Sequence, residues 1–378
     1  MRVEQHNLSG ASLGTQRAVT ALHFGPESAT RKIYIQASLH ANELPGALTA
    51  YHLRQKLLEL ESQDQLHSKI VLVPMCNPIG LGQSIHYAHV GRFDLFSGQN
   101  FNRLGDLSLF EMTLTQLKAD QTVFTSDAVS NVRTIRQAMG KALLQQKGMT
   151  QLEHLHLILL GLAYDADVVL DLHCDETAAL HMYMLPQLWP TLEPLARFLG
   201  SRCQLLAEDT HVNPFDEALS TVWSKLRVAY PDANIPYACA STTVELRSRA
   251  DVAHEFAVKD ANAIVQFLGF RGDVTLTAAQ SQILPDLLAT PNPLSGKAYV
   301  FAPHSGVVVF HIEAGDEIAE GQIVAEIIDP IQGESVGVFS PIDGFVYARN
   351  TIQFAQQGDN LISISGKVDL GHGAGLSA

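Results

Sequence analysis

Two histidines and one glutamate stand where their side chains could bind a metal ion. His40 and Glu43 follow an apolar run in the order His-Ala-Asn-Glu, and His173 ends a second apolar run. Two imidazoles and one carboxylate that leave a fourth position open have the composition of a catalytic zinc centre. The three residues are therefore candidate ligands for one Zn²⁺ per chain. The alternative is that the two histidines bind no metal and only form ordinary hydrogen bonds at the ends of two strands.

Two further acidic residues lie in strand-like segments. Asp171 comes two residues before His173, so on a strand both side chains share one face. Its carboxylate could orient a ligand imidazole from the second shell, or else cap a strand-end turn. Glu245 lies in the β-branched run that starts at Ser241. An ionised carboxylate is expensive there unless it is paired or functional, so Glu245 is a candidate functional residue.

Residues 91–106 show neither a helical nor a strand period and contain many polar groups, which predicts a long loop. Long loops are commonly functional. This loop adds Arg92, Asn102 and Arg103 between the candidate metal ligands. A lone loop arginine is usually a solvated surface group, but two arginines and several amides in one short stretch favour a role in a site.

The elements around these residues alternate between apolar strands and amphipathic helices. Strands are predicted at 33–39, 70–74, 168–172 and 242–246. Helices are predicted at 46–60, 127–146, 151–163 and 253–268, with Ser126 and Thr150 as N-caps of the middle two. This alternation indicates an α/β layer fold. The carboxyl ends of neighbouring parallel strands then converge at one crevice, which would bring the candidate ligands together.

The pattern changes near residue 285. A Pro-, Ser-, Thr- and Asn-rich linker at 286–297 is predicted to separate a catalytic domain, 1–285, from a C-terminal β domain, 298–378. Phe301, Pro303, Gly306 and Val308 recur 38 residues later, which predicts two similar halves of short strands. The arrangement resembles the barrel-sandwich hybrid of biotinyl and lipoyl carriers. No lysine lies between Lys297 and Lys367, so a swinging-arm role is not expected.

Composition excludes several classes of protein. The chain has 25 Lys and Arg against 39 Asp and Glu, a net charge of −14, which disfavours binding to nucleic acid or to an anionic membrane surface. Its apolar stretches are far shorter than the roughly 20 residues that span a bilayer. The N-terminal segment lacks the apolar core of a signal peptide, and the four cysteines are scattered. A cytoplasmic protein is therefore expected.

The sequence as a whole resembles one family. The segment His40–Glu43, the pair Asn102-Arg103, the segment Asp171–His173 and Glu245, in this order, resemble the succinylglutamate desuccinylase/aspartoacylase group, which is similar to the zinc carboxypeptidases. The resemblance covers about residues 30–270. It implies a carboxypeptidase-like mixed sheet flanked by helices, with a small C-terminal all-β domain of barrel-sandwich type.

The resemblance also implies a role for each residue. His40, Glu43 and His173 would bind zinc, and Glu245 would be the general base. Arg92 would polarise the scissile carbonyl.

A substrate carboxylate would be held by Asn102 and Arg103. Arg247 stands where the family often has glycine, and the sequence carries a long insert at about 106–150. In an acidic protein, Arg247 could add to a local positive site for substrate.

The implied reaction is hydrolysis of the amide bond of a small anionic N-acyl amino acid. Two alternatives stay open: a metallocarboxypeptidase acting on peptide C-termini, and a zinc-binding assembly protein without turnover. The C-terminal β domain could pair subunits, so a homo-oligomer is also possible. The sequence leaves the acyl group and the amino acid undefined.

Overall fold

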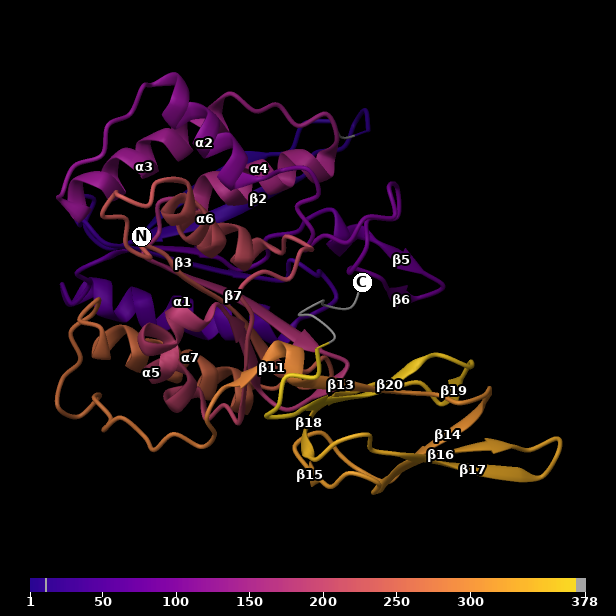
Figure 1. The fold of residues 1–378 in the computed structure, drawn as a ribbon. Helices are drawn as coiled ribbons and strands as arrows, with labels where there is room; N and C mark the ends of the chain where they lie inside the picture. The colour runs from indigo at the N-terminus through magenta and orange to yellow at the C-terminus, as the bar shows by residue number, and fades with distance from the viewer. Residues whose placement is uncertain (11, 372–378) are drawn as a thin grey trace.

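A nine-stranded mixed sheet runs through the centre of the molecule (Figure 1). The computed structural model describes residues 1–10 and 12–371. In spatial order the strands are β1 (Arg2–Asn7), β2 (Ala18–Phe24), β4 (Lys69–Val73), β3 (Lys32–Ala37), β7 (Val168–Asp175), β11 (Ala240–Ser248), β9 (His181–Met184), β10 (Cys203–Leu206) and β12 (Asn292–Pro293). The four central strands β4, β3, β7 and β11 pair in parallel. The outer pairs β1–β2, β2–β4 and β9–β11 are antiparallel.

Helices cover both faces of this sheet (Figure 1). One layer consists of α1 (Pro45–Ser62), α5 (Trp189–Leu199) and α7 (His254–Phe270), whose apolar sides share a core with the sheet. The other layer consists of α2 (Leu109–Ala119), α3 (Ala128–Leu144), α4 (Gln151–Ala163) and α6 (Phe215–Ala229). Because both faces are covered, β7 is buried over nearly its whole length. The predicted mixed α/β fold is confirmed.

The helix starts show how well local chemistry could be predicted. Thr150 caps α4 as expected, accepting a hydrogen bond from the Glu153 backbone N–H. The predicted cap Ser126 was wrong, since the Asp127 carboxylate accepts from the N–H groups of Val129 and Ser130 at the start of α3. The predicted insert at 106–150 holds α2 and α3, so it adds to one helical layer.

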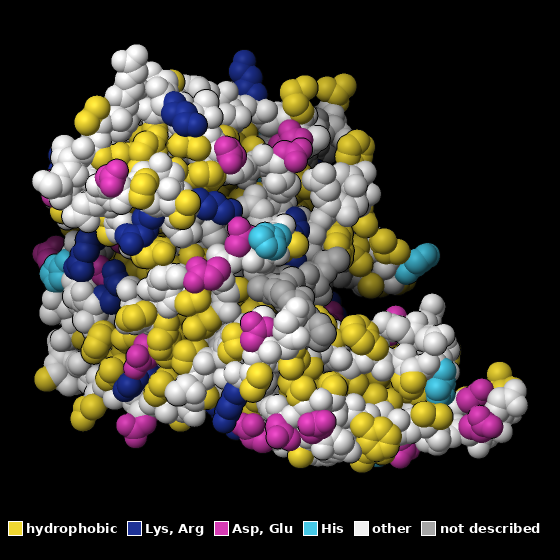
Figure 2. Space-filling model, in the orientation of Figure 1, with side chains coloured by type: hydrophobic (Ala, Val, Ile, Leu, Met, Phe, Trp, Pro, Cys, Tyr) yellow, Lys and Arg dark blue, Asp and Glu magenta, His cyan; other side chains and the backbone are white. Residues whose placement is uncertain are grey.

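Two smaller sheets follow along the chain. The first contains β13 (Lys297–Phe301), β20 (Asn360–Ser365), β18 (Gly344–Arg349), β15 (Glu317–Ile318) and β8 (Thr177–Ala178). The second contains β17 (Glu334–Phe339), β16 (Ile323–Asp329), β14 (Gly306–Phe310) and β19 (Phe354–Ala355). They enclose a core of their own, and the repeated sequence falls on the equivalent strands β14 and β18. Figure 2 shows acidic side chains gathered along the edge near β15.

The C-terminal sheets pack directly against the central sheet. β8, which comes from the region after β7, pairs with β18, and Leu205, Leu294 and Tyr347 belong to one apolar cluster. β12 and the short η3 helix (Leu294–Gly296) lie within the predicted linker. The predicted boundaries 1–285, 286–297 and 298–378 stay a prediction, and residues 372–378 lie outside the described residues.

The remaining elements are small. The short helices η1 (Gly80–Gly82) and η2 (Pro186–Leu188) follow β4 and β9, and β5 (Ser84–Ile85) pairs with β6 (Ala88–His89) as a hairpin. None of the helices within residues 1–10 and 12–371 combines the length and apolarity needed to cross a membrane.

Candidate metal centre and active site

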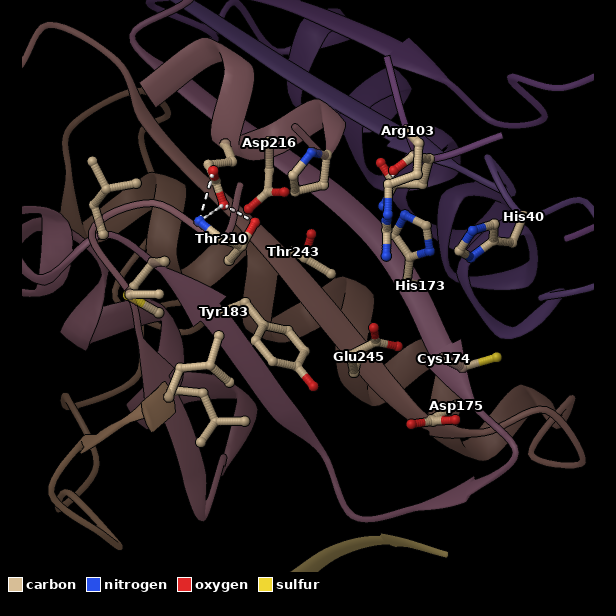
Figure 3. A pocket seen from close by; sticks show the side chains of 18 of the residues that line it. His40, Arg103, His173, Cys174, Asp175, Tyr183, Thr210, Asp216, Thr243 and Glu245 are labelled. Atoms are coloured by element: carbon tan, nitrogen blue, oxygen red, sulfur yellow. Dashed lines mark hydrogen bonds between the residues drawn. The ribbon is translucent and has the colours of Figure 1, made fainter. Parts of the chain in front are cut away.

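Three adjacent parallel strands bring the candidate residues to one end of the sheet. β3 is followed by the loop that carries His40 and Glu43, while His173 lies near the end of β7 and Glu245 lies on β11. In the register of β7 and β11, His173 and Glu245 stand directly beside each other. Figure 3 shows His40, His173 and Glu245 around a common space, with His173 and Glu245 on neighbouring strands. The convergence that the sequence predicted is therefore present.

His40, Glu43 and His173 form a buried cluster. The Nδ1 atom of His40 is 2.8 Å from Oε1 of Glu43, and the Nδ1 atom of His173 is 2.8 Å from Oε2. One possible ligand atom from each residue lies within 4.8 Å of the others, and all three residues are buried. This group can hold a metal ion.

The contacts of the outer imidazole nitrogens indicate which nitrogens would face a bound metal ion. The Asn102 backbone N–H donates to Oδ1 of Asn100 at 2.8 Å, which identifies that atom as oxygen. Nε2 of His40 lies 2.8 Å from the same oxygen and must therefore donate to it. In a neutral imidazole this leaves a lone pair on Nδ1, directed at the Glu43 carboxylate. Two acceptors that face each other at this distance fit a bound cation between them.

Asp171 lies beside the outer nitrogen of His173, as Asn100 lies beside that of His40. Its Oδ2 is 3.1 Å from Nε2 of His173, and its Oδ1 accepts a hydrogen bond from the Gln36 side chain. Asp171 is fully buried. The carboxylate thus lies where it would orient the His173 imidazole and direct Nδ1 inward.

The charges in the cluster change the pKa of each member. Burial alone would raise the pKa of Glu43, but the neighbouring His40 and His173 hold it well below its usual range. Burial lowers the pKa of His40, although Glu43 opposes this. Burial would also lower the pKa of His173, but the carboxylates of Asp171 and Glu43 raise it well above its usual range.

Arg92 reaches the cluster from the loop that follows β6. Its Nη1 lies 3.4 Å from both Oε1 of Glu43 and Nδ1 of His40. The loop can approach because residue 91 is glycine: the Gly91 carbonyl accepts from the Ala41 N–H, and a Cβ at Gly91 would meet the backbone N of Asn42 at 2.5 Å. The structure therefore places the Arg92 guanidinium beside the candidate metal ligands.

Glu245 lines the same cavity from β11. Burial raises the pKa of its carboxyl well above the usual range, an effect that His173 partly opposes. Its Oε2 is buried and has no hydrogen-bond partner among the residues that the structure describes. Glu245 is thus a carboxyl group available to a ligand beside the metal cluster.

Asn102 and Arg103 both line the cavity, but they make different contacts. Oδ1 of Asn102 accepts from the Phe215 backbone N–H at 2.9 Å, so this oxygen fixes the loop to the start of α6. Arg103 lines the cavity and donates to the Asn102 carbonyl. Burial and the nearby Arg92 lower the pKa of Arg103.

Arg247 does not reach the cavity, which corrects the expectation that it binds substrate. Its guanidinium makes a bidentate ion pair with Asp260 and lies 4.8 Å from the centre of the Phe256 ring. It also has a positive φ of 67°, within a register shift between β11 and β7. The side chain is therefore turned toward α7, where it pairs with a buried carboxylate.

Other cavity residues were missed by the sequence. They come from strands, a loop and the first turn of α6, in segments that carry no recognisable motif, and include Asp175, Tyr183, Thr210, Asp216, Glu217 and Thr243. Asn100 was missed as well, because its role depends on contacts with His40 and Asn102 that no spacing predicts.

A buried histidine on α4, His156, contacts the loop that carries Asn100 and Asn102. Nε2 of His156 lies 2.7 Å from the carbonyl oxygen of Phe101 and donates to it. In the sequence, Phe101 stands between Asn100 and Asn102. His156 and Phe101 are both buried. This contact connects the second helical layer to the loop that orients His40.

The stability of the protein should therefore depend on pH through His156. Burial lowers the pKa of His156 from 6.5 to about 4, although the Phe101 hydrogen bond opposes this. The unfolded chain then binds more protons than the folded chain between these values. The free energy of unfolding should fall as pH falls from about 6.5 to about 4, by up to about 3 kcal/mol.

Urea unfolding of the native chain and of His156→Gln, at about pH 7 and about pH 5, measures this contribution. The pH dependence should be smaller in His156→Gln. His154→Gln, two residues away and partly exposed, is the control. Equal pH dependence in all three proteins would contradict the assignment.

Comparisons with known proteins agree with this geometry. Residues 29–199, which include His40, Glu43 and His173, match the family model for the succinylglutamate desuccinylase/aspartoacylase catalytic domain. None of the curated protein sequences compared matches the chain.

Solved structures match along nearly the whole chain. A succinylglutamate desuccinylase/aspartoacylase family protein from Shewanella amazonensis SB2B has a TM-score of 0.83 at 22% identity, covering 97% of this chain and 98% of that one. One from Shewanella frigidimarina NCIMB 400 has a TM-score of 0.82 at 21% identity, covering 97% of each chain. The product-bound ectoine utilization protein from Ruegeria pomeroyi has a TM-score of 0.66 at 12% identity, covering 97% and 95%.

These structures share the fold, including the C-terminal strands. The family match supports a hydrolase of the desuccinylase/aspartoacylase type. Residues 29–199 thus match the succinylglutamate desuccinylase/aspartoacylase catalytic domain, in agreement with the resemblance noted in the sequence, and the fold of the chain is that of proteins of this family.

Proposed function

We propose that the chain is a zinc-dependent hydrolase that cleaves the amide bond of a small carboxylated N-acyl amino acid. The observation that carries this proposal is the position of Glu245, a half-buried residue with an enclosed Oε2, in the same cavity as His40 and His173. A metal site that only stabilised the fold would need no additional buried acid beside it. The family match supports the same reaction type.

Zinc suits the ligands better than other common ions. Two imidazole nitrogens and one carboxylate with room for a fourth ligand are the donor set of catalytic zinc, whereas calcium and magnesium prefer oxygen alone. Asn100 and Asp171 lie where second-shell partners hold ligand histidines. When bound, zinc would supply a Lewis acid that activates water and polarises a carbonyl.

Glu245 would act as the general base. Burial raises the pKa of its carboxyl, which makes the carboxylate a stronger base: it would accept a proton from the attacking water and return it to the leaving amine. Its place beside His173 on the adjacent strand puts it next to the metal ligands. Each proton taken up in the first half of the reaction would then leave with the product amine.

The two arginines would bind the charged parts of the substrate. Arg92, 3.4 Å from the Glu43 carboxylate, would stabilise negative charge that develops on the scissile carbonyl. Arg103, on the wall of the cavity, would bind the substrate carboxylate through its planar guanidinium. A positive site of this kind can bind a carboxylate despite the net charge of −14.

Replacing Arg103 with lysine should therefore weaken substrate binding. A lysine keeps the charge but cannot form the bidentate contact, so KM should rise by about tenfold or more while kcat changes less. Steady-state kinetics on N-acyl amino acids measures both constants. Arg202→Lys, which changes an exposed arginine outside the cavity, is the control. An unchanged KM in Arg103→Lys would place the carboxylate site elsewhere.

Metal analysis combined with a hydrolysis screen tests the proposal itself. The purified chain should contain about one zinc per molecule and should hydrolyse at least one member of an acetyl- and succinyl-amino-acid panel. Hydrolysis of peptides but not of acyl-amino acids would instead support a carboxypeptidase. Zinc without any hydrolysis would support a binding protein.

A further inference from the structure

The cavity beside the metal ligands contains two buried carboxylates that the reaction does not use. Asp216 and Glu217 lie in the first turn of α6 and line the cavity together with Arg103 and Glu245. Their exposed fractions are only 5% and 7%. Figure 3 shows Asp216 between Thr210 and Thr243, with the base Glu245 on the same strand as Thr243.

Hydroxyl, backbone amide and carboxyl groups are the partners that the structure records for these carboxylates, the carboxyl being that of Asp209 beside Glu217. Glu217 accepts hydrogen bonds from the backbone N–H and the hydroxyl of Thr210, and Asp216 interacts with the Thr243 hydroxyl. Among residues 1–10 and 12–371, no Lys, Arg or His nitrogen lies within 4.0 Å of either carboxylate, although the neighbouring Asp209 pairs with Lys225. Two adjacent buried carboxylates without a close cation are costly when ionised.

The wall next to these carboxylates is apolar. Met184, Leu185, Leu205 and Leu294 line the same cavity, and all four are nearly fully buried. Leu294 comes from the segment that leads into the C-terminal sheets, so that segment completes the cavity. An apolar wall beside an acidic group suits a ligand with an aliphatic stem and a positively charged end.

We propose that Asp216 and Glu217 select a substrate whose amino-acid side chain is aliphatic and ends in an amine or guanidinium. This inference rests on the proposed function and refines its substrate class to Nα-acyl derivatives of basic amino acids. Arg103 would bind the α-carboxylate, and the side-chain cation would contact the carboxylates of Asp216 and Glu217. The side chain of such a substrate is therefore basic, in contrast to succinylglutamate or acetylaspartate.

A different role for the carboxylates would give a different result. Asp216 and Glu217 both favour the charged form of Arg103, so they could serve only to position that arginine. In that case their removal would weaken every substrate equally, because all substrates share the α-carboxylate. A cation-binding role would weaken only the basic substrates.

The experiment compares ligands matched in length. Binding of lysine, ornithine, norleucine and glutamate to the zinc-loaded chain is measured by calorimetry, and kcat/KM is measured for the Nα-acetyl and Nα-succinyl derivatives. Lysine or ornithine should bind at least about tenfold more tightly than norleucine, and the same ratio should appear in kcat/KM. Calorimetry needs no turnover, so it tests the inference even if the hydrolysis screen fails.

Two variants and one control assign the preference. Asp216→Asn and Glu217→Gln keep the side-chain shapes and the threonine contacts, and each should reduce the preference for the basic ligand to about threefold or less. Glu208→Gln removes an exposed carboxylate from the same region and should leave the preference unchanged. Thermal unfolding establishes that each variant is folded.

Three results would overturn the inference. The first is tighter binding of glutamate or norleucine than of the basic ligands. If the N-acyl derivatives of glutamate or norleucine are then hydrolysed, the proposed function still holds. The second is an equal loss of affinity for all ligands in both variants, which would mean that Asp216 and Glu217 only position Arg103. The third is no measurable binding of either basic ligand.

Discussion

Replacing His173 with alanine should abolish stoichiometric zinc binding and hydrolysis together. His173 supplies one of three ligands in a buried cluster, and its Nδ1 lies 2.8 Å from the Glu43 carboxylate. A site with one imidazole and one carboxylate lacks the three protein ligands typical of catalytic zinc. His40→Ala should behave in the same way, since His40 occupies the other side of Glu43.

The measurement is zinc content per chain after dialysis, followed by the hydrolysis rate with and without added zinc. The variant should lose activity by several orders of magnitude, because both water activation and carbonyl polarisation depend on the metal. His154→Ala removes a histidine on α4 that is not part of the cluster, and it should retain zinc. Full zinc occupancy in His173→Ala would rule out this residue as a ligand.

The variant must also be shown to be folded. Removal of the imidazole leaves the buried carboxylates of Glu43 and Asp171 without the group between them, which should lower stability. Circular dichroism and urea unfolding separate this effect from loss of the metal. A folded variant without zinc and without activity is the expected outcome.

Replacing Glu245 with glutamine should retain zinc and lose turnover. The amide has nearly the same size and hydrogen-bonding capacity, but it cannot take up a proton. We expect kcat to fall by about a thousandfold, within the range usual for loss of a general base. KM should change less, because Glu245 is not expected to bind the substrate carboxylate.

Zinc analysis and steady-state kinetics on the same preparation distinguish this variant from His173→Ala. Glu176→Gln serves as a control, since Glu176 pairs with Arg249 and is not part of the lining of the cavity that contains Glu245. A near-normal kcat in Glu245→Gln would exclude Glu245 as the base, and loss of zinc would instead indicate that it binds the metal. The two variants together thus separate metal binding from proton transfer.

Much of the fold could be predicted from local patterns in the sequence. The apolar runs before His40 and at 168–172 are strands because burial on both faces favours continuous apolar sequence. Their order with the intervening helices predicted parallel pairing, and parallel pairing places strand ends on one side of the sheet. The sequence was therefore enough to predict that four side chains lie close together: His40, Glu43, His173 and Glu245.

Contacts between residues far apart in the chain could not be predicted in this way. Arg247 lies only two residues from Glu245, but a positive φ turns its side chain away to Asp260. Asn102 lines the cavity, as a substrate-binding residue should, but the contact of its Oδ1 with the start of α6 could not be predicted.

By itself, the sequence determined the α/β architecture, the helix that Thr150 caps, and the convergence of His40, His173 and Glu245 at one end of the sheet. Only the tertiary structure decided that Asn100 orients His40 and that Asp216 lines the same cavity as Glu245. The physical reason is that periodicity and capping act over a few residues of chain. The direction of a polar side chain depends on partners that lie dozens of residues away and become neighbours only after folding.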